Sequence, residues 1–247
     1  MIGIGENEHY LASDATPIVE YTKEVVYLND EEIAIIRRGQ DLEIKTIKNK
    51  NKTPYVQTLE MNLSALEKGG YAHFMLKEIY EQPQVIGDTL TSFLNPAERT
   101  VTLPELSFDL AGVERLTLIA CGTSYYACQV ARYWVEELAG IPVDVDVASE
   151  FRYRNAPMSA GGAALFVSQS GETADTLAAL RHAKSKGQHI LSVVNVPEST
   201  IARESDGVLP TLAGPEIGVA STKAFTTQLV VLACFAIALG RARGHID

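Results

Sequence analysis

Three hydroxyl-rich turns stand out in the sequence, because each lies between a predicted strand and a predicted helix. They are Gly122-Thr123-Ser124, Ser168-Gln169-Ser170-Gly171-Glu172-Thr173 and Val219-Ala220-Ser221-Thr222-Lys223. The start of a helix offers unpaired backbone N–H groups and about half a unit of positive charge. Hydroxyls add donors that can rotate toward an oxygen, and glycine lets a bulky anion approach the backbone. Together these features predict a phosphate site that needs no net positive charge.

Helix capping is the simpler explanation for any one of these turns, with Ser170 or Ser221 as the capping residue. Three such turns at one edge of a sheet favour phosphate binding, because ligands of doubly wound sheets bind beyond the carboxyl ends of the strands. Gln169 can both donate and accept a hydrogen bond, which suits sugar hydroxyls better than phosphate. The sequence contains neither a P-loop pattern nor Gly-x-Gly-x-x-Gly after a strand, so a nucleotide site is not indicated.

Other side chains near the turns have a structural explanation as well as a functional one. Cys121 ends a buried run and is expected to be a core or pocket-lining residue rather than a nucleophile. Glu172 could act as a general base, but a carboxylate in the first turn of a helix is already stabilised by the dipole. Lys223 could pair with phosphate or lie in solvent. Glu150 and Arg152 could line the rim of a pocket, although a solvated or structural ion pair is the preferred interpretation.

No cofactor, metal site or catalytic residue is predicted. The five histidines have no metal-like spacing, and His182 is expected on a helix surface. The formal net charge of −10 argues against nucleic acid or a membrane as partner. No run of about 18 apolar residues indicates a membrane span. The three scattered cysteines fit a reducing cytoplasm rather than a disulfide framework.

The elements that must position these turns alternate between strand and helix from residue 113 onward. Strands are expected at 115–121, 143–149, 163–168 and 189–195, and helices at 124–140, 171–187, 199–205 and 221–244. This order predicts an α/β fold with a doubly wound parallel sheet. Gly140 and Gly187 are expected to end their helices.

The N-terminal part has a different pattern and is expected to be mainly β. Strand-like runs at 24–28, 32–37 and 41–47 with turns between them predict an antiparallel meander. A short helix is expected over 15–22, capped by Thr16 and begun by Pro17. A second helix is expected within 71–95, with Pro83 as a kink or break, followed by a linker-like stretch.

Several motifs occur together in one order: ACGTSYYA, ASEFRYR, SQSGETADTLAALR, NVPEST followed by IARESD, and EIGVASTKAFTTQL. They closely resemble the first sugar isomerase (SIS) domain of glutamine:fructose-6-phosphate aminotransferases, which make glucosamine 6-phosphate. HFMLKEIYEQP resembles the interdomain helix of that family. The resemblance implies that 1–66 is the end of a glutaminase domain, with the fold of an N-terminal-nucleophile hydrolase. It likewise implies that 67–95 is a helical linker and 96–247 the first SIS domain, of flavodoxin-like type.

The resemblance also implies a ligand and a site. Fructose 6-phosphate or glucosamine 6-phosphate is the expected ligand, and a homodimer through the SIS domain is the expected assembly. In the family, hydroxyls of the second turn hold the phosphate. The implied contact residues are Cys121, Gly122, Thr123, Ser124, Ser168, Gln169, Ser170, Thr173, Val219 and Ser221.

The family's catalytic groups have no counterpart in the sequence. No cysteine precedes Cys121, whereas glutamine hydrolysis in the family uses an N-terminal cysteine. The family's glutamate, histidine and lysine for the sugar chemistry belong to a second SIS domain and a C-terminal tail. We therefore expect a sugar-phosphate-binding portion that is inactive alone. A stand-alone binding module is one alternative, and a domain that assembles through the apolar face of helix 224–239 is another.

Overall fold

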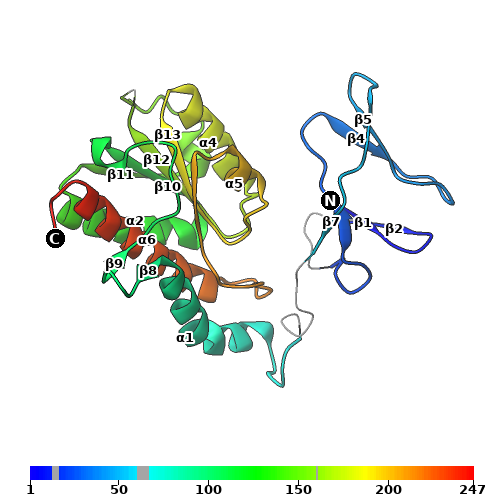
Figure 1. Cartoon of the computed structure of the whole chain (residues 1–247), viewed down its shortest axis with the longest axis horizontal. Coiled ribbons are helices and arrows are strands. Elements are labelled where there is room, and N and C mark those ends of the chain that lie inside the picture. Colours follow the sequence, from blue (N-terminus) through cyan, green and yellow to red (C-terminus); the bar gives the residue numbers. More distant parts are fainter. Residues whose placement is uncertain (13–16, 60–66, 160) are drawn as a thin grey trace. The chain divides into compact units, whose positions relative to one another are not determined.

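The structure is a computed structural model that describes residues 1–12, 17–59, 67–159 and 161–247. It divides into two units, Met1–Gly70 and Tyr71–Asp247 (Figure 1). The first unit is built from short strands. The second contains the alternating strands and helices on which the three turns lie.

Two small antiparallel sheets form the first unit. The four-stranded sheet has the order β2-β1-β3-β7, with β1 (Ile2–Ile4), β2 (His9–Leu11), β3 (Glu24–Val26) and β7 (Gln57–Thr58). The three-stranded sheet has the order β4-β5-β6, with β4 (Glu32–Ile35), β5 (Glu43–Thr46) and β6 (Asn51–Lys52). The mainly β prediction is therefore confirmed.

The predicted meander of consecutive strands is wrong at its first connection. β3 pairs with β1 and β7, and β4 pairs with β5 in the other sheet. The Glu32 carboxylate accepts hydrogen bonds from the backbone and side-chain nitrogens of Asn29, at 2.9 and 3.1 Å, where the chain passes from one sheet to the other. Val26 and Ile44 then share one small core. Burial against a second sheet thus replaces pairing between neighbours in sequence.

The helix expected over 15–22 is wrong in its described part, and Thr16 lies outside the described residues. Residues 17–21 form a turn, in which the N–H groups of Tyr21 and Thr22 both donate to the Ile18 carbonyl, at 2.8 and 3.0 Å. Ile18 is buried. It lies so close to Gly3 that a Cβ there would be 2.6 Å from Ile18 Cγ2. Packing on β1 therefore decides the local conformation.

The second unit contains a parallel five-stranded sheet of order β11-β10-β12-β13-β14. Its strands are β10 (Leu116–Ala120), β11 (Val143–Val147), β12 (Ala163–Ser168), β13 (His189–Val194) and β14 (Gly207–Pro210). Its helices are α1 (Phe74–Phe93), α2 (Gly122–Ala139), α3 (Ala148–Phe151), α4 (Ala174–Ser185), α5 (Thr200–Glu204) and α6 (Lys223–Ala242), with a 3-10 turn at Leu110–Gly112. The predicted doubly wound α/β fold is confirmed.

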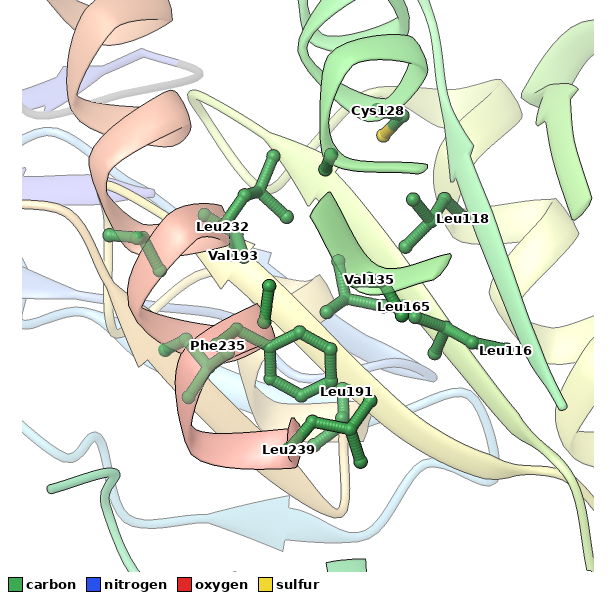
Figure 2. Packing of buried hydrophobic residues seen from close by; sticks show 14 of the residues in the cluster. Leu116, Leu118, Cys128, Val135, Leu165, Leu191, Val193, Leu232, Phe235 and Leu239 are labelled. Atoms are coloured by element: carbon green, nitrogen blue, oxygen red, sulfur yellow. The ribbon is translucent and has the colours of Figure 1, made fainter. Parts of the chain in front are cut away.

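Both faces of the sheet are covered, as a parallel sheet requires. Alternate residues of β10 and β12 point to opposite faces, so Leu118 and Leu165 join one core while Ile119 and Phe166 join the other. Figure 2 shows the first core, where leucines and valines of the strands meet side chains of α2 and α6 such as Phe235. α3, α4 and α5 complete the second core.

α6 is the one helix in the described part that is long and apolar enough to cross a membrane. Of that apolar stretch, 61% is buried inside the unit. It packs against α2 and α1, so its apolar faces are core surface. The alternative of assembly through the apolar face of 224–239 is therefore not favoured, because most of that stretch is buried within the unit.

α1 continues through Pro83 without ending there. After it, β8 (Leu94–Asn95) and β9 (Thr100–Val101) pair in a small antiparallel hairpin within the stretch expected to be a linker. α1 also packs along α6, and it buries the polar residues Lys77, Glu78 and Thr89. These residues bear on the third turn, as described below.

Candidate functional site

The first and second turns lie side by side at the carboxyl edge of the sheet. β10 and β12 are paired in parallel, with Ala120 opposite Val167, so Cys121 and Ser168 leave the sheet next to each other. The chain runs from β10 to β11 on one side and then returns to β12 on the other. This is the point at which a doubly wound sheet changes direction, where such sheets bind ligands.

Hydroxyl groups of the second turn form a connected network. Ser168 is only 4% exposed, and its Oγ accepts a hydrogen bond of 3.0 Å from the Gly171 N–H. The same Oγ lies 3.2 Å from Thr173 Oγ1, with either hydroxyl able to donate. Ser170 Oγ accepts from the Glu172 N–H at 3.2 Å. These hydrogen bonds connect the residues of the turn to one another.

Gly171 is required by the geometry of this turn. Its φ is +66°, in the left-handed region that side chains disfavour. A Cβ at this position would lie 2.0 Å from Ser199 Oγ. The Gly171 carbonyl also accepts from the Ile201 N–H, at 3.0 Å. The close approach of the turn to α5 thus depends on glycine.

Glu172 is not available as a free general base. Its Oε1 accepts a hydrogen bond of 2.7 Å from the backbone N–H of Thr200, the first residue of α5. The sequence suggested that the dipole of α4, the helix that follows, stabilises this carboxylate. The structure assigns it to the start of α5 instead, which residue spacing within the turn could not indicate.

The first turn is more open than the second. Gly122 has a φ of +58°, and a Cβ built there would meet no atom within 4 Å. Cys121 is half-buried, as expected for a lining residue. No side-chain hydrogen bond caps α2 at Cys121 or α4 at Thr173. Ser170 lies before the N-cap residue of α4, and its Oγ accepts from the Glu172 N–H rather than from an N–H of the helix, so the capping explanation for Ser170 is wrong. Two adjacent helix starts keep donors for a ligand.

The third turn is built differently. Glu216 lies just before it, and its Oε1 accepts from the N–H groups of Thr222 and Ala224, at 2.8 and 3.1 Å. Its Oε2 accepts from the Ser221 hydroxyl at 3.1 Å. A carboxylate of the protein thus occupies the start of α6. Val219, at the tip, is fully exposed.

Lys223 is neither free for phosphate nor exposed to solvent, so both interpretations offered for it are wrong. It is 4% exposed, and its Nζ donates to Glu81 Oε2 at 2.7 Å. Glu216 and Glu81 were missed in the sequence. Neither has capping-box spacing, and the local charge partner of Glu81, Lys77 one turn earlier in α1, gives no sign of the contact with Lys223. Glu81 meets Lys223 because α1 packs along α6, whereas Glu216 folds back on the N–H groups at the start of the helix that follows it.

The remaining candidates hold the framework around the turns. Arg152 donates to Asp175 in the first turn of α4 at 2.8 Å, and this hydrogen bond raises the pKa of the guanidinium. An ion pair of Arg152 is therefore confirmed, but its partner is Asp175 rather than Glu150, which was considered together with it. His182 is half-buried with its ring edge-on to Phe151, so its expected place on the helix surface is wrong.

Comparison with known protein families agrees with this architecture. The family model described as SIS domain matches residues 109–238, which include β10 to β14 and most of α6. The chain belongs to the SIS domain family. Its SIS domain therefore carries all three turns, and its parallel sheet is the fold expected of the family.

Relatives of this SIS domain protein include two named glutamine–fructose-6-phosphate aminotransferase [isomerizing]. The one from Zymomonas mobilis is 51% identical over 247 residues, and the one from Bradyrhizobium diazoefficiens is 52% identical over 256 residues. Each alignment includes 100% of this chain and 40% of the relative, so the chain spans less than half the length of these relatives. The resemblance drawn from the motifs is confirmed over the whole chain.

A solved structure agrees as well. The C-terminal domain of glucosamine-fructose-6-phosphate aminotransferase from Francisella tularensis is 44% identical, with a TM-score of 0.68. The match covers 73% of this chain and 51% of that chain.

Proposed function

We propose that the SIS domain binds fructose 6-phosphate as part of a glutamine:fructose-6-phosphate aminotransferase, for conversion to glucosamine 6-phosphate. The observation that carries the proposal is the hydroxyl network of Ser168 and Thr173, which lies beside two helix starts that no side chain caps. The names of the relatives and of the Francisella tularensis structure support the same substrate class.

In this proposal the first two turns bind the phosphate, and Gln169 and the third turn bind the sugar. The phosphate is held by the second turn, where Ser168, Ser170 and Thr173 surround the start of α4. The first turn, from Cys121 to Ser124, adds backbone donors at the start of α2. Gln169 binds sugar hydroxyls. Because Glu216 already occupies the start of α6, Val219 and Ser221 are assigned to the sugar rather than to the phosphate.

We expect binding without turnover from these residues alone. The two carboxylates nearest the turns, Glu172 and Glu216, accept hydrogen bonds from backbone N–H groups and are committed to positioning loops. Proton transfer on the sugar therefore needs groups outside the ten contact residues assigned above.

The assembly and the compartment are proposed with the same function. We infer a homodimer through the SIS domain. It is supported by a row of exposed apolar side chains on α2, at Tyr126, Val130 and Tyr133, whose spacing places them on one face of the helix. Light scattering on the purified chain tests the dimer.

The compartment and the domain organisation are proposed as well. Free cysteines favour the cytoplasm. Residues 1–66 are proposed as the end of a glutaminase domain, and residues 67–95 as the linker to the SIS domain.

Calorimetric titration tests the binding proposal. Fructose 6-phosphate should bind, whereas unphosphorylated fructose should not bind at the same concentrations. Inorganic phosphate should compete with the sugar phosphate, because both use the second turn. Absence of heat with fructose 6-phosphate at millimolar concentration, or equal binding of fructose, would refute the proposal.

A further inference from the structure

α1 carries acidic groups on one side that serve another segment of the chain. Glu78 and Glu81 are three residues apart, which places them on one face of the helix. Glu78 is only 2% exposed, an uncommon state for a carboxylate unless its oxygens accept hydrogen bonds. The hydrogen-bond donors around Glu78 therefore show which segment of the chain α1 positions.

Both carboxylates contact the segment that contains the third turn. Glu78 Oε1 accepts from the backbone N–H groups of Ile217 and Gly218 at 2.6 and 2.9 Å, and Oε2 lies 3.2 Å from the latter nitrogen. Glu81 binds Lys223 at the start of α6. Glu78 thus fixes the backbone directly before the exposed residue Val219.

The approach of α1 to this loop is unusually close. A Cβ on Gly218 would lie 2.4 Å from Glu78 Oε2 and 3.4 Å from the Cα of Met75. Farther along the helix, Thr89 Oγ1 accepts from the Leu212 N–H at 3.1 Å. The loop is therefore attached to α1 on both sides of the Glu78 contact.

We propose that Glu78 is a positioning residue for sugar-phosphate binding, acting through the backbone of Ile217 and Gly218 on Val219 and Ser221. The proposal rests on the proposed function, because it assigns the third turn to the sugar. Glu78 itself does not touch the ligand. Its carboxylate satisfies two N–H groups and so holds the turn in the orientation in which it meets the sugar.

Loss of this carboxylate leaves two partly buried N–H groups without an acceptor, which favours movement of the loop toward water. The proposal predicts that Glu78→Ala weakens fructose 6-phosphate binding about tenfold, the equivalent of one misplaced hydrogen bond. Glu78→Gln keeps an oxygen in the Oε1 position, which accepts the two shorter hydrogen bonds, and loses only the 3.2 Å contact of Oε2 with the Gly218 N–H. The amide variant should therefore restore affinity to within about threefold of wild type.

The experiment compares these variants by calorimetry on the 247-residue chain, with Asp88→Ala as the matched control. Asp88 is an exposed carboxylate of the same helix, and it accepts a hydrogen bond from Gln84 at 2.8 Å. Hydrogen exchange of the 217–221 and 168–173 amides is measured on the same samples. Glu78→Ala should speed exchange in the former and leave the latter unchanged. If it does not fold, Gly218→Ala is used instead, because its methyl group displaces the Glu78 carboxylate.

Each outcome decides the proposal. Weak binding by Glu78→Ala, recovery by Glu78→Gln and wild-type binding by Asp88→Ala support it. Wild-type affinity in Glu78→Ala, or equal weakness of the alanine and glutamine variants, overturns it while leaving the proposed function intact. Failure of the wild type to bind refutes the proposed function instead, and the exchange data still decide whether Glu78 holds the loop.

Discussion

Removal of the Ser168 hydroxyl is the most direct test of the second turn. In Ser168→Ala the phosphate of the proposed complex loses a donor, and the Gly171 N–H loses the acceptor that it has at 3.0 Å. A hydrogen bond to a charged group contributes about 1.5–3 kcal/mol. The freed N–H can turn to the phosphate and offset part of the loss. The expected weakening is therefore about 1–3 kcal/mol, or about 5- to 150-fold in Kd.

Thr173→Ala is the cleaner companion, because it leaves the Ser168–Gly171 hydrogen bond in place while removing the hydroxyl 3.2 Å away. It should also weaken binding by about 1–3 kcal/mol. Both variants are titrated with fructose 6-phosphate and inorganic phosphate. Both ligands should weaken in parallel if the turn binds the phosphate group.

Ser185→Ala is the matched control for this pair. Its hydroxyl is exposed near the end of α4 and donates to the His182 carbonyl at 2.7 Å. Thermal unfolding of each variant separates loss of binding from loss of fold. Unchanged affinity in both Ser168→Ala and Thr173→Ala would refute the phosphate site, whatever the control shows.

Four further predictions concern the framework and electrostatics of the site. Gly171→Ala should destabilise the fold by about 2–5 kcal/mol in urea unfolding, because it combines a positive φ with a Cβ 2.0 Å from Ser199 Oγ. Hydrogen bonds from Arg181 lower the pKa of Glu204 from its ordinary 4.5. The contribution of this carboxylate to the free energy of unfolding is therefore present above pH 4.5 and is lost as the pH falls through the lowered pKa. Glu204→Gln should flatten the pH dependence of stability in that acid range. Cys121→Ser should leave fructose 6-phosphate affinity within about threefold, because the thiol only lines the turn. Raising salt from about 50 to 300 mM should not weaken binding, because backbone and hydroxyl donors supply the site and the net charge is −10.

Matched comparisons decide these predictions. Gly187 also has a positive φ, +74°, but a Cβ there would meet open space, so Gly187→Ala should lower the free energy of unfolding by only about 1–2 kcal/mol. An equal loss in Gly171→Ala and Gly187→Ala would contradict the steric argument. An unaltered acid profile in Glu204→Gln would exclude the Arg181 pair as its cause. Abolished binding in Cys121→Ser would show that the thiol contacts the ligand. A steep fall of affinity with salt would indicate lysine or arginine contacts instead.

The fold of the second unit could be predicted because its signals are local. A buried parallel strand such as Ala163–Ser168 appears in sequence as a short apolar run, and its end is marked by polar turn residues. Gly140 has a φ of +65° and ends α2 as predicted. In the first unit the strands were located, but not their partners. The pairing of β3 with β7 joins residues far apart in sequence, and no local pattern specifies it.

The same distinction applies to the candidate site. The second turn lies within six consecutive residues, so its hydroxyl groups could be recognised together. Lys223 was misread because its partner Glu81 is 142 residues away and meets it only when α1 packs along α6. Glu172 was assigned to the wrong helix for a similar reason, since its acceptor role depends on how α5 returns to the sheet. Distant contacts of this kind have no signature in spacing.

The positions of the carboxylates support the assignment of the phosphate to the first two turns and of the sugar to the third. The protein places its own anion at the start of α6, through Glu216, and at the start of α5, through Glu172. α2 and α4 begin without a side-chain cap, and the strands before them are adjacent in the sheet. In a chain with net charge −10, an anionic ligand is repelled at long range, so donors at short range must hold it. The two uncapped starts supply such donors, and for this reason the phosphate is assigned to them rather than to the third turn.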